Sequence, residues 1–186
     1  MDPFVHLHVA SGYSLKYGGS SPARLVERAA DADMDTLALT DRDGMYGAIR
    51  FAKACLTANL RPLLGVDLAI EPGGLVGSAA GSPDSGSARM ARAARTSPAR
   101  GGMYRDPVLP RVTLLAGSKR GWAALCRLVS ATHLRGERGV PVTTQELIAD
   151  SLSGLTSGCD LLVLLGPTSE LGQAATLRRE ASRSFT

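Results

Sequence analysis

Two histidines near the start of the chain are the residues best suited to chemistry. His6 and His8 lie in residues 4–8, a short apolar segment that is predicted to form a β-strand. Successive side chains of a strand alternate faces, so both imidazoles are expected on one side. Such a pair can bind Zn, Mn or Fe if other ligands arrive from elsewhere. Such pairs are more often half-buried histidines with backbone partners than metal ligands.

Carboxylates follow two further predicted strands. Asp41 comes directly after residues 36–40, and Asp67 directly after residues 62–66. Two amphipathic helices connect these strands, one capped by Ser21 and one ending at Asn59. This βαβαβ order predicts an α/β fold with a parallel sheet or barrel. The carboxyl ends of parallel strands meet on one side, so His8, Asp41 and Asp67 are expected there together.

The second half of the chain is predicted to add two strands and three helices. The strands are residues 112–116 and 160–165, which makes five parallel strands in all. A helix over residues 120–133 ends at His133, which is either a ligand or a residue close to the helix end. A capping box beginning at Thr143 starts a short helix, and Thr168 caps the last one.

Composition indicates one globular domain with an interruption. The chain has 186 residues, of which 44% are apolar and 20% charged, and a net charge of +4. Residues 72–110 are rich in Gly, Ser, Ala, Arg and Pro and are predicted to be a disordered insertion rather than a basic arm for nucleic acid. The expected divisions are residues 1–71, the insertion 72–110, a continuation 111–177 and an unstructured tail 178–186.

The cysteines and the N-terminus indicate the compartment. Cys55, Cys126 and Cys159 are odd in number, far apart and set in apolar surroundings, which predicts reduced packing residues. The chain shows no signal-peptide pattern and no apolar run of bilayer length. A cytoplasmic location without membrane contact is therefore expected.

Several short motifs, in their order and spacing, resemble a known family. They look like the N-terminal polymerase-and-histidinol-phosphatase (PHP) domain of bacterial DNA polymerase III alpha subunits and their error-prone relatives. The resemblance covers about residues 4–70 and 111–172 and is carried by His6-Leu-His8, Tyr13-Ser14, Ala38-Leu-Thr-Asp41, Gly44-Met-Tyr-Gly47-Ala48, Pro62-Leu-Leu-Gly65 and Val112-Thr-Leu-Leu-Ala116. It implies a distorted (β/α) barrel whose active members hold metal ions for phosphoester hydrolysis.

Five strands are too few to close such a barrel, so an incomplete barrel is expected. The chain is therefore expected to be a truncated product or a fragment. The first strand would have an open edge, and the chain would self-associate or need a partner.

The resemblance also implies which residues remain of the family's metal site. His6 and His8 match first-strand ligands, and Asp67 stands where the family usually has Glu. Tyr17, Arg42 and Arg111 replace three other family ligands, and an arginine cannot lose its charge to coordinate a metal. Arg42 is expected to pair with Asp41 or Asp67 in place of the metal. Divalent Zn or Mn is thus expected to bind weakly or not at all, and no catalytic residue is assigned.

Two functions remain open. The first is a non-catalytic module of an alpha-type DNA-directed DNA polymerase of replication or translesion synthesis. Its partners would be the polymerase body or other replication subunits, with DNA contacted only through a polymerase region that this sequence lacks. The second is a metal-dependent phosphoesterase or 3′–5′ exonuclease of the same family. Because the polymerase carboxylates are missing from this sequence, the chain alone is expected to be inactive in DNA synthesis.

Overall fold

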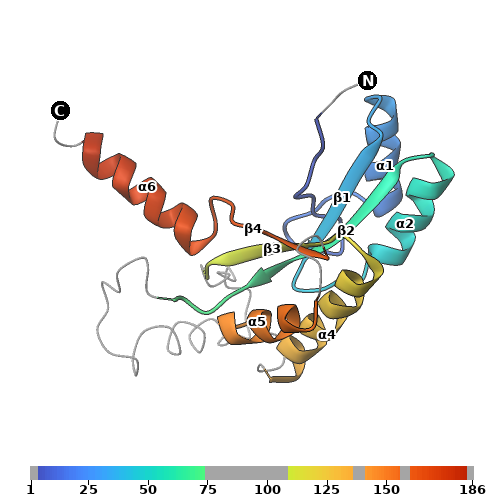
Figure 1. Ribbon diagram of the computed structural model, residues 1–186. Coiled ribbons are helices and arrows are strands. Elements are labelled where there is room, and N and C mark those ends of the chain that lie inside the picture. Colours follow the sequence, from blue (N-terminus) through green and yellow to red (C-terminus); the bar gives the residue numbers. More distant parts are fainter. Residues whose placement is uncertain (1–3, 74–108, 136–140, 156–159, 184–186) are drawn as a thin grey trace, which may run out of the picture.

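The computed structural model describes residues 4–73, 109–135, 141–155 and 160–183, with side chains up to residue 176. Most of the predicted insertion, residues 74–108, lies outside these ranges, as does Cys159. None of the described helices is long and apolar enough to cross a membrane. The elements follow the order α1, β1, α2, β2, β3, α4, α5, β4 and α6 (Figure 1).

The described strands form one mixed sheet with the order β1-β2-β3-β4. Strands β1 (Thr36–Arg42) and β2 (Arg61–Ala69) are parallel. Strands β3 (Arg111–Ala116) and β4 (Leu161–Leu164) are each antiparallel to the strand before them. The α/β class is confirmed, but the prediction that all strands are parallel is wrong, because β3 runs opposite to β1, β2 and β4 and both of its pairings are therefore antiparallel. A buried strand has the same apolar composition whether it runs parallel or antiparallel to its neighbour, so composition does not predict strand direction.

The predicted first strand is not a strand, although it runs beside β1. The amide of Ala38 donates to the carbonyl of His6 at 3.0 Å, and the amide of Thr40 to that of Val9 at 2.8 Å. The amide of Val9 donates to the Thr40 hydroxyl instead of a backbone oxygen, at 2.9 Å. Because a side chain takes this bond, the regular ladder is interrupted. The segment still covers the outer edge of β1.

Helices α1 (Pro22–Asp31) and α2 (Ala48–Thr57) agree with the sequence. Ser21 caps α1 by accepting a hydrogen bond from the amide of Arg24 at 3.3 Å. Asn59 follows α2 with a φ of 55°, a left-handed conformation that Asn tolerates and that ends a helix.

The later helices differ from the prediction at their ends. Helix α4 spans Lys119–Arg135, and α5 spans Gln145–Ser153 with Thr144, not Thr143, as its cap. Thr143 is held in extended pairing instead, because its amide donates to Ala69 at 2.8 Å and its carbonyl accepts from Glu71 at 3.0 Å. Helix α6 (Glu170–Arg183) continues past residue 178, where the tail was expected to begin.

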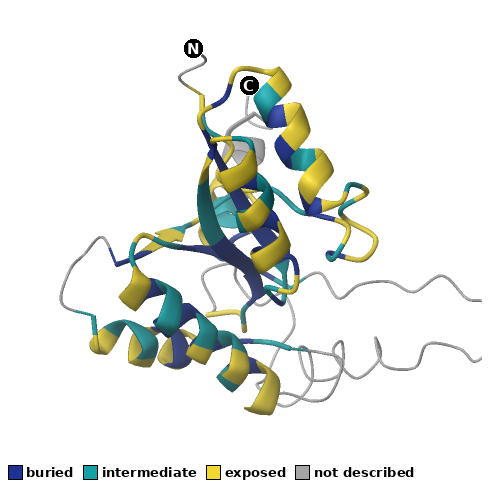
Figure 2. Ribbon diagram, turned by 90° about the vertical axis from the view of Figure 1, so that its right-hand side faces the viewer, coloured by how far each residue is buried: buried dark blue, intermediate teal, exposed yellow. Residues whose placement is uncertain are grey.

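Helices α1, α2, α4 and α5 lie on one face of the sheet (Figures 1 and 2). Helix α2 packs against β2 and α1 against α2, while α4 packs against β3 and α5 against α4. Two buried clusters result; the first contains Val26, Ala29, Met34, Leu37, Leu39, Phe51, Cys55 and Leu60, and the second Val66, Leu68, Val112, Leu114, Leu125, Leu128, Leu147, Ile148 and Leu161. By strand alternation and register, the strand residues of both clusters share this face. The opposite face carries the polar residues Thr40, Arg42, Asp67, Arg111 and Thr113.

Candidate functional site

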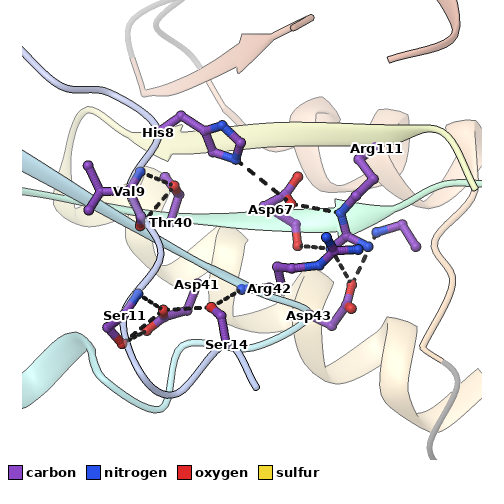
Figure 3. A network of polar contacts seen from close by, with 11 residues as sticks. His8, Val9, Ser11, Ser14, Thr40, Asp41, Arg42, Asp43, Asp67 and Arg111 are labelled. Atoms are coloured by element: carbon purple, nitrogen blue, oxygen red, sulfur yellow. Dashed lines mark hydrogen bonds and ion pairs between the residues drawn. The ribbon is translucent and has the colours of Figure 1, made fainter. Parts of the chain in front are cut away.

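The polar face brings its charged side chains together where β1 and β2 end (Figure 3). Arg42, the last residue of β1, is the register partner of Asp67 on β2. Arg111 opens β3 and pairs in register with Ala69, near the end of β2. Because β3 is antiparallel to β2, its first residue lies beside the last residues of β2. The side chains that sequence analysis singled out on three separate segments are thus neighbours.

Arg111 supplies the cation for Asp67. Its Nε donates to Asp67 Oδ2 at 2.7 Å and its Nη2 to the Asp67 carbonyl at 2.7 Å. The same Nη2 lies 2.9 Å from Asp43 Oδ1. Sequence analysis had expected Arg42 to provide this cation. The direction of β3 explains the difference, because only an antiparallel β3 places Arg111 at this end of the sheet.

Both members of this ion pair are buried, and their pKa values reflect it. Burial by itself would raise the pKa of Asp67, but the contact with His8 and the charge and hydrogen bond of Arg111 outweigh it and hold that pKa below its ordinary value. Burial by itself would lower the pKa of Arg111. The negative charges and hydrogen bonds of Asp43 and Asp67 outweigh this effect and raise that pKa above its ordinary value. Asp67 is therefore an ionised partner of a permanent cation.

Asp41 lies nearby but has different partners. Its carboxylate is buried and accepts from the amide of Ser11 at 2.7 Å and from the hydroxyls of Ser11 and Ser14 at 2.9 and 2.8 Å. The Ser14 hydroxyl in turn accepts from the amide of Arg42 at 2.9 Å. Sequence analysis did not predict these roles for Ser11 and Ser14. Asp41 therefore fixes the loop after the N-terminal segment to the end of β1.

Four further residues lie around the ion pair of Arg111 and Asp67. The guanidinium of Arg42 stacks over the ring of Tyr17, with 3.5 Å between its central carbon and the ring centroid. Asp43, which was not predicted, has a φ of 55° and turns its carboxylate to Arg111. His133 lies in the last turn of α4, and its Nε2 is 2.6 Å from the backbone carbonyl oxygen of Asp43. Its position links α4 to the turn after β1.

Both N-terminal histidines are exposed, and His8 lies at the rim of this site. His8 has a side chain that is 57% exposed, and its Nε2 lies 3.8 Å from Asp67 Oδ2. The ring of His6 packs edge-on against Phe4, with 4.8 Å between ring centroids. Within the described parts of the chain, no group of three or more His, Cys, Asp or Glu residues is arranged to hold a metal ion.

Comparison with known proteins identifies the family. The model of the PHP domain matches residues 6–184. The chain belongs to the PHP domain family.

Relatives of this PHP domain are bacterial DNA polymerases. It is 32% identical over 84% of its length to the error-prone DNA polymerase of Mycolicibacterium paratuberculosis and 31% identical over 94% to that of Mycobacterium bovis. It is also 32% identical over 82% of its length to the DNA polymerase III subunit alpha of Treponema pallidum. The chain covers only 12%, 14% and 11% of these three proteins, respectively.

Solved structures resemble this PHP domain more distantly. An amidohydrolase from Chromobacterium violaceum matches 70% of the chain with a TM-score of 0.44 and 21% identity, and the match covers 33% of that enzyme. A putative metal-dependent phosphoesterase from Bifidobacterium adolescentis matches 80% of the chain and 48% of its own length, with a TM-score of 0.36 and 15% identity.

Proposed function

We propose that this chain is the PHP module of an alpha-type bacterial DNA-directed DNA polymerase, acting in replication or translesion synthesis, and that its role is structural. Its relatives are polymerases of which it matches a small part. The observation that carries the structural role is the buried ion pair of Arg111 with Asp67. The partners would be the polymerase body or other replication subunits in the cytoplasm, and DNA would be contacted only by the polymerase region.

The donor set around Asp67 does not fit a divalent metal ion. A metal at this carboxylate would lie next to a guanidinium that cannot lose its proton and whose charge repels it. The guanidinium nitrogen already lies 2.7 Å from Asp67 Oδ2, the oxygen nearest to His8. We therefore infer that His6, His8 and Asp67 are the remains of a degenerate metal site, to which Zn or Mn binds weakly or not at all.

The guanidinium instead holds the ends of three strands together. Through Asp67 it joins β3 to β2, and through Asp43 it joins both to the turn after β1. A fixed cation in this place makes the polar face independent of metal supply. A rigid module with these properties suits a scaffold within a larger polymerase better than a hydrolase.

Metal analysis tests this proposal. The purified chain, dialysed against metal-free buffer, is expected to hold substoichiometric Zn and Mn by elemental analysis. Its thermal unfolding should be the same with and without EDTA. Two or three tightly bound ions per chain would contradict the degenerate site.

A metal-dependent phosphoesterase or 3′–5′ exonuclease is the second candidate. It is favoured by one observation, the exposed imidazole of His8 beside an ionised carboxylate. Assays with 4-nitrophenyl phosphate and with DNA 3′ ends, supplied with Mn or Zn, are expected to show no rate above background, because metal-activated hydroxide is missing. A rate that disappears in both His6→Ala and His8→Ala, but not in the surface variant Arg24→Met, would replace the structural proposal with this one.

A further inference from the structure

The guanidinium of Arg111 lies in a cage of oxygen atoms (Figure 3). Its Nε donates to Asp67 Oδ2 at 2.7 Å, and its Nη2 donates both to the Asp67 carbonyl at 2.7 Å and to Asp43 Oδ1 at 2.9 Å. The side chain of Arg111 is only 8% exposed in this position, whereas that of Asp43 is 29% exposed. The protein therefore encloses the guanidinium almost completely, with Asp43 on the solvent side of the cage.

Bonds that do not involve Arg111 hold this cage in shape. The amide of Asp43 donates to the Asp67 carbonyl at 2.8 Å, and the amide of Ala69 donates to Asp43 Oδ1 at 3.2 Å. Asp67 itself lies in β2, which pairs with β1 on one side and with β3 on the other. The turn and the sheet thus position the oxygens of the cage, and we expect these oxygens to stay in place when the Arg111 side chain is shortened.

The spacing of these oxygens suits a planar cation better than a spherical one. The two acceptors of Nη2 lie along N–H bonds that diverge by about 120° in a planar guanidinium, which places these oxygens about 5 Å apart. Zn–O bonds are about 2.0–2.2 Å long, so one Zn ion joins oxygens that are no more than about 4.4 Å apart. Among the described residues, His, Cys, Asp and Glu accordingly form no group of three or more that could hold a metal ion. The cage therefore differs from a metal site that has only lost ligands.

We propose that these oxygens form a binding site selective for a guanidinium group, and that Arg111 is its tethered ligand. This inference rests on the degenerate metal site proposed above and adds which kind of cation takes the place of the metal. An ammonium or a metal ion has a single centre, whereas the bonds to the cage come from two nitrogen atoms in one plane. The ligand class that the cage accepts is therefore an alkylguanidinium ion, and a point charge of the same sign does not replace it.

Chemical rescue of Arg111→Ala tests this selectivity. The variant lacks the atoms of an ethylguanidinium ion, which can be supplied in solution. For a site with a Kd of about 10 mM, ethylguanidinium chloride at about 50 mM is expected to raise the melting temperature of the variant by about 2–4 °C. Ethylammonium chloride at the same concentration is the matched control, and neither it nor Zn or Mn should raise that temperature. In the wild-type chain the cage is already filled, so ethylguanidinium should give no rise there.

A lysine variant keeps the test decisive if Arg111→Ala does not fold. Lysine retains the charge but offers one nitrogen atom in place of two, so Arg111→Lys is expected to melt at a lower temperature than the wild type. An equally stable Arg111→Lys would overturn the inference, as would an Arg111→Ala that ethylguanidinium does not stabilise or that ethylammonium, Zn or Mn stabilises equally well. Tightly bound metal in the wild-type chain is a separate result, which would overturn the proposed function as well.

Discussion

Arg111 is the residue on which the polar face depends. It is buried, it contacts two carboxylates, and those carboxylates belong to different elements. A buried ion pair gains little over apolar packing, but the loss of one partner leaves the other charged and desolvated. Removal of this guanidinium is therefore expected to lower the free energy of unfolding more than removal of a surface charge.

Substitution of Arg111 by methionine tests this dependence. We expect Arg111→Met to lower the free energy of unfolding by about 3–5 kcal/mol, because Asp67 is left without a cation. Arg24→Met is the matched control, since Arg24 pairs with Glu27 at 2.9 Å on the exposed face of α1. Its cost should be below about 1 kcal/mol. Urea titration measures both, and equal costs would show that burial of the pair does not matter.

The pKa of Asp67 predicts an acid-sensitive contribution to stability. The folded pKa lies below the ordinary 3.8, so the unfolded chain binds a proton more readily than the folded one. The contribution is therefore complete above the ordinary pKa and is lost as the pH falls through the folded value. The difference in stability between wild type and Asp67→Asn should be constant above about pH 5 and shrink at lower pH. A difference independent of pH down to about pH 2 would contradict this reading.

At the scale of elements, α4 is fixed to the start of β4 by a close approach. Ser118 caps the helix by accepting from the Gly121 amide at 3.1 Å, and its hydroxyl also bonds to the Asp160 carboxylate. A Cβ on Gly121 would collide with the Asp160 carbonyl, which belongs to the backbone and cannot rotate away. Helix and strand can approach this closely only with glycine at residue 121.

Alanine substitutions of two glycines test this packing. Gly121→Ala is expected to lower the free energy of unfolding by about 1–3 kcal/mol, because α4 must move away from Asp160. Gly154→Ala is the control, since nothing lies within 4 Å of a Cβ placed there and its φ is −87°. It should be neutral or slightly stabilising. Chemical unfolding of both variants gives the comparison, and a tolerated Gly121→Ala would mean that the contact is loose.

Hydrogen exchange tests the irregular N-terminal segment. Amides of residues 5–8 are expected to exchange faster than those of residues 37–39, because the segment is held to β1 by few backbone bonds whereas β1 pairs with β2 along its length. The bond from Ala38 to the His6 carbonyl protects the Ala38 amide, not the amide of His6. Exchange followed by NMR or mass spectrometry gives the order. Equally slow exchange in both segments would indicate a regular fifth strand.

At the scale of the whole molecule, two buried clusters lie under one helix-covered face. Phe51 belongs to the cluster around α1 and α2, and Leu128 to the cluster around α4 and α5. The clusters have no buried residue in common. Strand β2 contributes Val66 and Leu68 to one cluster, and its Leu64 packs against the other. The sheet is therefore the element that connects them mechanically.

A double substitution tests how independent the clusters are. Phe51→Leu and Leu128→Val should each lower the free energy of unfolding by about 1 kcal/mol. The double variant is expected to lose their sum within about 0.5 kcal/mol, as for sites without shared partners. Denaturant unfolding of the three variants gives the cycle. A larger deviation would show that β2 transmits strain from one cluster to the other.

The sequence alone determined most of the local structure and the family. Periodicity and capping residues predicted α1, α2, β1 and β2 nearly to their ends, because these features depend on neighbouring residues. The motifs from His6 to Ala116 indicated the PHP family, which the comparison confirmed. The sequence also placed Asp67, Arg42 and Arg111 among the residues of one site.

Only the tertiary structure decided how these residues pair. The direction of β3 is set by packing across the sheet, and it brings Arg111 rather than Arg42 to Asp67. The hydroxyl of Thr40 takes the Val9 amide and interrupts the predicted first strand, and Thr143 leaves the cap of α5 to pair with Ala69. In each case a partner distant in sequence competes with the local pattern, and the energy of that contact cannot be read from neighbouring residues.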